Sequence, residues 1–209
     1  MQSAAERIEG LETAIRQAAE SWRWQPVIKA LMSLRSVDFL TAMTIVAEVG
    51  DLRRFEHSRQ LMSYLGLVPS EFSSGNSRQR SALTRTGNSR VRRLLVEAAW
   101  NYRHPARLSR EIEIRQEGQP AVIVDIAWKA QLRLCHRYHK LRYRGLHQNK
   151  TCAAIARELV GFVWDIARRV RPLPPAQIKA VNTGFHRRRA RGNPAPSSKP
   201  FVEGNSQNT

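Results

Sequence analysis

Apolar residues recur every three or four positions along most of the chain, which is the period of an amphipathic α-helix. Over residues 4–23 this stripe consists of Ile8, Leu11, Ile15, Ala18 and Trp22. The stripe is narrow and begins almost at Met1, so it has the form of a coiled-coil seam that pairs with another helix. We therefore expect residues 1–25 to form a coiled-coil-like helix.

Two shorter helical patterns follow, and each carries its own start or stop signal. Pro26 interrupts the first stripe, and a second helical segment extends to about Leu34. Asp38 is suited to the N-cap of a helix over residues 39–49, and Gly50 to its left-handed end. We expect this helix to pack through Leu40, Met43, Val46 and Ala47.

The next segment begins with a short helix and then loses its period. Ser58 is the expected cap of a helix that carries Leu61, Met62 and Leu65 and ends at Gly66. From Pro69 onwards we expect a loop with Ser73, Ser74 and Gly75, then coil as far as a turn at Gly87 and Asn88.

The second half of the chain returns to helical patterns. A helix from Ser89 is predicted by Val91, Leu94, Leu95, Ala98 and Tyr102. After a polar stretch and a turn at residues 118–120, a long helix over residues 121–142 is predicted by Ile123, Ala127, Ala130, Leu134, Tyr138 and Leu141. Gly145 ends it, and a last helix over residues 151–170 is predicted by Ile155, Leu159, Phe162, Val163, Ile166 and Val170. We expect an all-α domain over residues 26–170.

Residues 171–209 carry most of the prolines and almost no apolar pattern, which is typical of disorder. The run from His186 to Arg191 within them is a basic arm that adds nonspecific affinity for nucleic acid, or an extension with no role.

Composition changes this picture mainly through charge. The 209 residues include 35 Lys and Arg against 17 Asp and Glu, a net charge of +18. Such a chain attracts polyanions, and nucleic acid is the commonest of them. A ribosome-associated or membrane-surface protein is the alternative. No apolar run approaches the ~20 residues of a membrane span. The start resembles no signal peptide, and Cys135 and Cys152 have no ligand spacing, so we expect a cytoplasmic protein with reduced cysteines.

Two groups of cations are candidates for phosphate contacts. Arg90, Arg92 and Arg93 lie in the first turn of a predicted helix, where the dipole disfavours cations unless an anion is bound. The predicted long helix presents Lys129, Arg133, Arg137 and Lys140 with no acidic partner nearby in the sequence. Both groups favour a nucleic-acid contact over the alternative of a solvated face.

The loop around Ser74 has two interpretations from the residues alone. A hydroxyl beside a glycine and among arginines has the form of a nucleophile that attacks a phosphate. Ser-Ser-Gly-Asn-Ser is equally the composition of a flexible polar loop.

A wider motif gives this loop a context. Gly66-Leu67-x-Pro69 is followed by Ser74-Gly75 and then by the run TRTGNSRVRRLL, residues 84–95. This order resembles the C-terminal transposase domain of the IS-one-ten (IS110) family of insertion-sequence transposases, which are RNA-guided DNA recombinases. The later run over residues 147–170 is similar to the tail of one branch of that family.

The resemblance implies a role for specific residues. It identifies Ser74 as the nucleophile that forms a phosphoserine link to DNA, with Ser73 as the runner-up. Residues expected to orient phosphates are Arg78, Arg80, Arg85, Asn88, Arg90, Arg92 and Arg93. It also implies a helix-hairpin-helix-like unit before Gly50, although residues 34–38 lack the hairpin glycine of the family.

The resemblance assigns residues 1–25 to the end of a coiled-coil linker, and it implies partners as well. The family holds Mg²⁺ with acidic residues of an N-terminal RuvC-like domain, and we find neither that domain nor a metal site in this chain. We therefore expect DNA, a guide RNA and a RuvC-like partner domain or homo-oligomer as partners, with Mg²⁺ only in the complete enzyme. The alternatives are a noncatalytic all-α nucleic-acid-binding module and an inactive, truncated transposase remnant.

Overall fold

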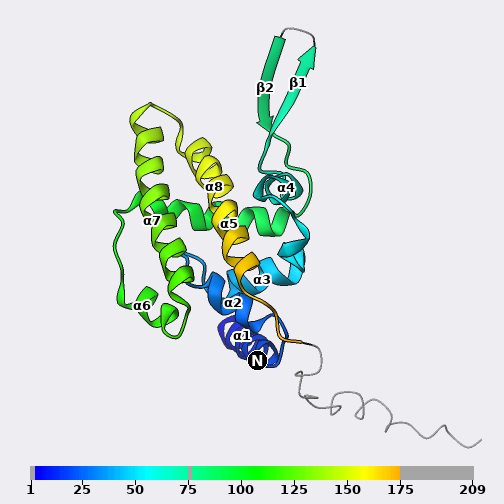
Figure 1. Ribbon diagram of the computed structural model, residues 1–209, viewed down its shortest axis with the longest axis vertical. Helices are drawn as coiled ribbons and strands as arrows, with labels where there is room; N and C mark the ends of the chain where they lie inside the picture. The colour runs from blue at the N-terminus through cyan, green and yellow to red at the C-terminus, as the bar shows by residue number, and fades with distance from the viewer. Residues whose placement is uncertain (1–2, 75–76, 175–209) are drawn as a thin grey trace, which may run out of the picture. The chain divides into compact units, whose positions relative to one another are not determined.

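Helices make up most of the computed structural model, which describes residues 3–74 and 77–174. The elements are, in order, α1 (Ala4–Glu20), α2 (Gln25–Leu31), α3 (Phe39–Val49), η1 (Leu52–Arg54), α4 (Ser58–Tyr64), β1 (Pro69–Ser74), β2 (Ser77–Leu83), α5 (Ser89–Trp100), η2 (Asn101–Arg103), α6 (Arg110–Gln116), α7 (Ala121–Tyr143) and α8 (Gln148–Arg169) (Figure 1). The predicted all-α class is confirmed; one pair of strands accompanies the helices in the described residues.

The last helix is the centre of the packing. Helix α8 contacts α7, α5, α4, α2 and η1 (Figure 1). Its apolar stripe is almost fully excluded from solvent, as Ile155, Leu159, Val163 and Ile166 show. Burying four aliphatic side chains of this size contributes roughly 1.5–3 kcal/mol each before conformational entropy is subtracted. The predicted stripe of α8 is therefore the main wall of the core.

Several predicted helix ends are confirmed by the local hydrogen bonds. Asp38 caps α3, where its Oδ1 accepts from the backbone N–H of Thr41 at 2.8 Å. Gly50 ends the helix with φ 72°, in the region that favours glycine. Gly145 takes φ 78° directly after α7. The capping residue and the glycines in the sequence were therefore sufficient to predict where these helices begin or end.

Other boundaries differ from the prediction. Helix α1 ends at Glu20, and Pro26 lies in the first turn of α2, where its missing N–H costs nothing. Helix α4 is capped by His57 and not by Ser58. Helix α8 begins at Gln148 and not at the predicted Thr151. The prediction began too late because the first turn of this helix is polar and gives no apolar signal.

A further helix was absent from the prediction. The segment Arg110–Gln116, expected as part of a polar connection, forms α6, with Ser109 accepting from the N–H of Ile112 at 3.4 Å.

Ala18 and Ala47, expected in packed stripes, are exposed. A single methyl group has little apolar surface to bury, so the hydrophobic effect constrains the positions of these two alanines only weakly.

The largest correction concerns residues 69–83, predicted as loop and coil. They form an antiparallel hairpin in which β1 pairs with β2, with an irregularity between Pro69 and Glu71 (Figure 1). The sequence of both strands is mostly polar, so it has no period-two apolar alternation to indicate a strand. The pairing of the two backbones in register defines this hairpin.

The helix-hairpin-helix-like unit expected before Gly50 corresponds to α2 and α3, and its likeness to the family's unit stays a prediction. Helices α2 and α3 pack together, and residues 32–38 connect them. Ser36 takes φ 65° in this connection, a conformation that glycine adopts more easily. In α1 the apolar stripe is exposed, with Ile8 58% and Leu11 64% accessible, so its pairing with another helix stays a prediction.

Two expectations concern the remaining chain. The predicted disordered tail begins at residue 171, and its residues 175–209 lie outside the described part of the structure. Among the described residues, no helix combines the length and apolar character needed to cross a membrane.

Candidate functional site

The predicted nucleophile lies at the far end of the hairpin strand β1. Ser74 is the last residue of this strand and is paired in register with Ser77 of β2. Ser73 is paired with Arg78, and Glu71 with Arg80. The hairpin therefore brings the backbones of Ser73 and Arg78 together, which a coil would not do.

Two glycines join the hairpin to the helices at a segment that we call the hairpin root, residues 64–68 and 84–88. Gly66 and Gly87 have φ values of 65° and 75°. A Cβ on Gly66 would lie 2.2 Å from the carbonyl oxygen of Thr86, and a Cβ on Gly87 would lie 1.9 Å from that of Tyr64. The two chain segments cross too closely for any other residue type.

Backbone hydrogen bonds close the hairpin root. The N–H of Thr84 donates to Val68 O at 2.9 Å, and the N–H of Arg85 donates to Gly66 O at 3.2 Å. Leu65 and Leu67, which flank Gly66, are buried in the main core. The position of the hairpin base is therefore set by the packed helices.

Arg92 holds the hairpin root from α5. Its Nη1 donates to Leu65 O at 2.9 Å and to Thr86 O at 2.8 Å, which are carbonyls from both sides of the root. The guanidinium group thus links the two segments that Gly66 and Gly87 bring together. This contact was not foreseen, because the sequence indicated only a cation in a first helical turn.

Asn88 has a structural task at the same place. Its side-chain oxygen accepts from the N–H of Val91 at 2.9 Å and caps α5, while its Nδ2 donates to Glu48 at 2.7 Å. Glu48 also accepts from Arg90 at 2.9 Å. One carboxylate of α3 therefore fixes the start of α5 and offsets part of the positive charge there.

Arg85 and Arg93 are open to solvent, whereas the side chains of the predicted contacts Arg78 and Arg80 lie outside the described part of the structure. Arg93 forms an ion pair with Glu97 one turn later, at 2.8 Å, and its side chain is 80% accessible. Arg85 is exposed at φ 54°, beside the hairpin root. Arg85 and Arg93 both line a small cavity of about 340 Å³ against α5.

The predicted basic edge of α7 is partly neutralised, which corrects the expectation that no acidic partner is near. Glu158 of α8 accepts from Arg133 at 3.0 Å and from Arg137 at 3.1 Å. Its partners are 21 and 25 residues away in sequence, on a neighbouring helix, so local spacing gave no sign of it. Lys129 and Lys140 are exposed, and no ion pair involves them within the described residues.

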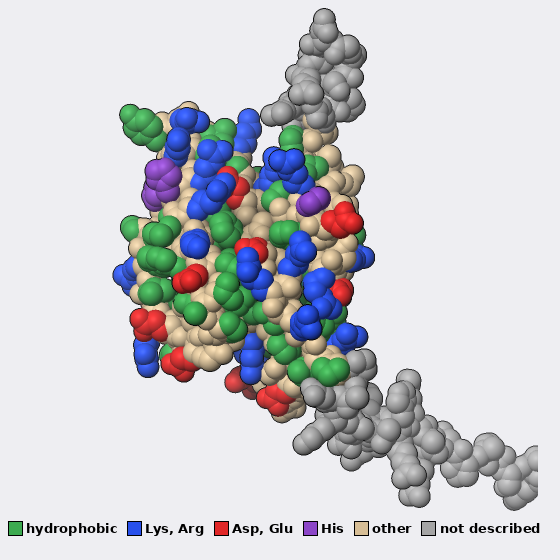
Figure 2. Space-filling model, viewed as in Figure 1, with side chains coloured by type: hydrophobic (Ala, Val, Ile, Leu, Met, Phe, Trp, Pro, Cys, Tyr) green, Lys and Arg blue, Asp and Glu red, His purple; other side chains and the backbone are tan. Residues whose placement is uncertain are grey.

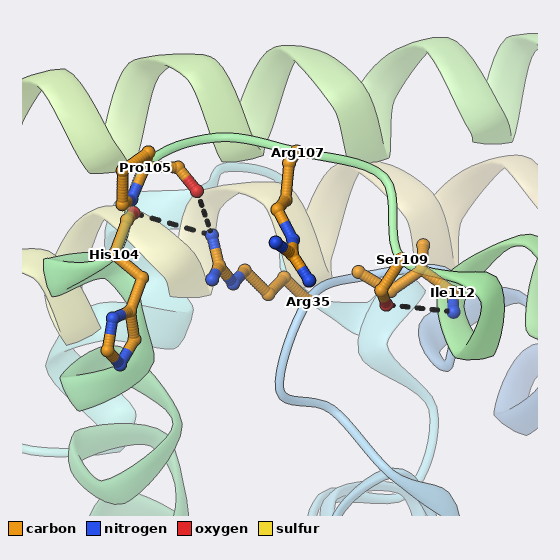
Figure 3. Close-up of a pocket in the computed structure, with 6 residues that line it drawn as sticks. All are labelled: Arg35, His104, Pro105, Arg107, Ser109 and Ile112. Atoms are coloured by element: carbon orange, nitrogen blue, oxygen red, sulfur yellow. Dashed lines mark hydrogen bonds between the residues drawn. The ribbon is translucent and has the colours of Figure 1, made fainter.

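A second cavity, of about 400 Å³, lies at the α2–α3 connection (Figure 3). Here Arg35 Nη1 donates to the carbonyl oxygens of His104 and Pro105, at 3.4 and 2.9 Å. The hydroxyl of Tyr102 donates to Arg35 O at 3.1 Å, and burial raises the pKa of this phenol above its ordinary value. The acceptors of Arg35 are supplied by the protein, so it holds the segment after α5 against the α2–α3 connection.

The cysteines and acidic residues form no reactive or metal-binding set. Cys135 and Cys152 are buried and unpaired, and burial raises the pKa of both thiols. Within residues 3–74 and 77–174, no three His, Cys, Asp or Glu side chains lie together as metal ligands. The described residues of this chain therefore do not fit a Mg²⁺ site.

Comparison with known proteins places this architecture in a family. The model of the transposase IS116/IS110/IS902 family matches residues 28–112, which include the hairpin, its root and α5. A putative transposase, y4qE, of Sinorhizobium fredii is 49% identical over 163 residues, 78% of this chain and 42% of the relative.

More distant relatives carry the same description. The transposase for insertion sequence element IS1533 of Leptospira borgpetersenii is 31% identical over 138 residues, which are 66% of this chain and 40% of the relative. That for IS1111A of Coxiella burnetii is 30% identical over 140 residues, 66% of this chain and 32% of the relative. The chain thus spans less than half the length of these curated relatives. By the family match and these relatives, the chain belongs to the IS116/IS110/IS902 family of transposases.

Proposed function

We propose that this chain acts in insertion-sequence transposition and supplies Ser74 as the nucleophile that attacks DNA. The observation that carries the proposal is the place of Ser74, at the end of a strand whose base is fixed by Gly66, Gly87 and Arg92. A nucleophile has to be held at a defined distance from the groups that bind its substrate. The hairpin root meets this requirement at the base of the strand.

The proposed step conserves the number of phosphoester bonds. The Oγ of Ser74 loses its proton and forms a bond to the phosphorus of a DNA phosphodiester. The bond from phosphorus to one neighbouring sugar oxygen breaks, and that oxygen takes up a proton. The product is a phosphoserine link, and reversal with a different sugar hydroxyl joins a new strand.

The predicted cations divide between substrate contact and support in this proposal. Arg78, Arg80, Arg85, Arg90 and Arg93 are the proposed contacts of the phosphates, because guanidinium groups match pairs of phosphate oxygens. Asn88 and Arg92 hold the hairpin root through the hydrogen bonds described above. They act on the reaction by positioning.

The proposal includes partners outside the described residues. DNA is the substrate, a guide RNA selects it, and a RuvC-like domain or a second copy completes the enzyme. Mg²⁺ bound by such a domain would stabilise negative charge at the transferring phosphate. We assign no step in this chain to a metal, since its described residues form no site for one.

A covalent-adduct assay tests the nucleophile. The chain is combined with the RuvC-like domain and guide RNA of its own element, Mg²⁺ and end-labelled element DNA, and the label that stays with protein under denaturing conditions is measured. We expect Ser74→Ala to abolish the adduct, and Ser73→Ala and Ser77→Ala, its neighbours in sequence and in register, to retain it.

Two results would overturn the assignment. An adduct that persists in Ser74→Ala and disappears in Ser73→Ala would move the nucleophile by one residue. Strand exchange with no adduct in any variant would leave the chain as a noncatalytic nucleic-acid-binding module.

A further inference from the structure

A second basic surface adjoins the hairpin root. It shares only Arg85 with the phosphate contacts proposed above, and Arg137 with the predicted basic edge of α7. It is a groove of about 980 Å³ between α4, the base of the hairpin, α7 and α8. Pro69, where β1 begins, and Leu83, where β2 ends, lie at the base of the hairpin and form part of the wall of the groove. Figure 2 shows Lys and Arg side chains gathered on the face over α4, α7 and α8.

Five cations from four different parts of the chain line this groove. They are Arg59 of α4, Arg85 of the hairpin root, Arg137 of α7, and Lys150 and Arg157 of α8. Their convergence is a product of the fold, since α4 and α8 are about ninety residues apart in sequence. Basic side chains that the fold collects along a groove are the electrostatic footprint of a polyanion.

Four of these cations have no side-chain partner among the residues that the structure describes. Within the described residues, Arg59, Arg85, Lys150 and Arg157 make no hydrogen bond or ion pair through their side chains. Only Arg137 is paired, with Glu158 at the edge of the same groove. Four unpaired cations along one surface repel one another, and a bound anion removes that repulsion.

The rest of the lining indicates which part of a polyanion would bind. Met62, Ala153 and Ala154 supply apolar surface between the cations, and the described lining includes no aromatic side chain. Bases of a nucleic acid are usually held by stacking on aromatic rings, whereas the backbone is held by Lys and Arg. The groove is therefore suited to a sugar–phosphate backbone and not to the reading of bases.

The distance from the groove to Ser74 connects this surface with strand cleavage. Ser74 is five residues from Pro69 along β1, and a strand rises ~3.3 Å per residue, so the two Cα atoms are about 17 Å apart. Along B-DNA, with ~3.4 Å per base pair, that length corresponds to about five base pairs.

We propose that the groove binds the phosphate backbone of the DNA about five base pairs from the phosphodiester that Ser74 attacks. The substrate class rests on the proposed function, whereas the groove and its unpaired cations do not. DNA held at the hairpin root and at the hairpin end is fixed at two points, which sets the cleaved position along it.

Binding measurements on two matched double variants test the proposal. The groove pair is Arg59→Gln with Lys150→Gln, and the control pair is Arg7→Gln with Lys29→Gln. Each pair removes one Arg and one Lys, and all four residues are exposed. Fluorescence anisotropy with a labelled 20-base-pair DNA, its single strand and an RNA of the same sequence is recorded between 50 and 300 mM NaCl.

Counterion release gives the expected size of the effect. Each lost phosphate contact reduces the salt slope by about 0.9 for duplex DNA and 0.7 for a single strand. The groove pair should therefore lower the slope by about 1.8 or 1.4, and weaken binding at 0.1 M salt by about 60-fold or 25-fold. We expect the control pair to change the slope by less than half as much.

The outcomes separate the groove from the nucleophile. Loss of binding in the groove pair for either form of DNA supports the proposal, and the size of the slope change tells duplex from single strand. Equal losses in both pairs, or a loss confined to RNA, would overturn it. An adduct that forms at Ser74 while the groove pair binds DNA normally would reject the groove alone; a groove-dependent loss with no adduct would reject the nucleophile alone.

Discussion

Replacing Gly87 with alanine should lower the free energy of unfolding by more than the cost of its left-handed backbone conformation alone. Gly87 has φ 75°, and a left-handed conformation costs a residue with a Cβ roughly 1–2 kcal/mol. The new Cβ would also lie 1.9 Å from the carbonyl oxygen of Tyr64. Relief of that overlap needs a backbone shift, and overpacking of this kind costs about 1–3 kcal/mol. The total is about 2–5 kcal/mol.

The chain contains a control for the conformational part alone. Gly118 has φ 73°, but no atom lies within 4 Å of a Cβ built on it. Gly118→Ala should therefore cost only the roughly 1–2 kcal/mol of the left-handed conformation. The difference between the two variants isolates the close approach of the two segments in the hairpin root.

Urea unfolding measures this difference. At an unchanged m value, the midpoint of Gly87→Ala should correspond to a free energy of unfolding lower by about 1–3 kcal/mol than that of Gly118→Ala. The effect should be global, since Leu65 and Leu67 of the hairpin root belong to the main core. Faster amide exchange at Thr84 and Arg85, the donors that close the root, is the local signature. Equal midpoints for the two variants would refute the argument that the glycines are required by space.

Three further predictions follow from other parts of the structure. Asn88→Ala removes the cap that accepts from Val91 and should lower the free energy of unfolding by about 0.5–2 kcal/mol in urea titrations; no change would contradict the capping role. Tyr102→Phe removes the hydrogen bond to Arg35 O at a cost of about 1 kcal/mol. Because burial raises the folded-state pKa of this phenol, the wild type should lose stability as the pH rises above about 10, and the Phe variant should lose less in parallel melts at pH 7 to 11. Glu158→Gln should tighten DNA binding severalfold at 0.1 M salt in the anisotropy assay, and weaker binding would contradict the assigned electrostatics.

The helices could be predicted because their signals are local. The N-cap Asp38, the stop at Gly50 and the stripe of α8 are each contained within a few turns of chain, and all three are confirmed. The polar hairpin could not be predicted in this way. The sequence of its strands is mostly polar and has no period-two apolar alternation, and its pairing depends on the hairpin root, which brings together residues about twenty positions apart.

The candidate site was predictable in composition but not in arrangement. The sequence indicated a serine among arginines, and the hairpin sets Ser73 opposite Arg78 in register. Sequence reasoning overlooked Arg59 and Arg157, because each is a single arginine in an ordinary helical pattern. Only the packing of α4 against α8 brings them into one groove. Convergence between distant elements leaves no trace in local spacing.

The arginines of this fold perform two different tasks. The two groups differ in whether the guanidinium group donates to acceptors within the described protein. Arg92 and Arg35 donate to backbone carbonyls of neighbouring segments, and these bonds are lost if the guanidinium moves to a phosphate. Among the described residues, Arg59 and Arg157 have no hydrogen bond or ion pair to give up when an anion binds, so the free energy of their new contacts is available for binding. Neutralising the first kind should therefore lower stability at any salt concentration, whereas neutralising the second kind should leave stability unchanged and alter the salt dependence of DNA binding.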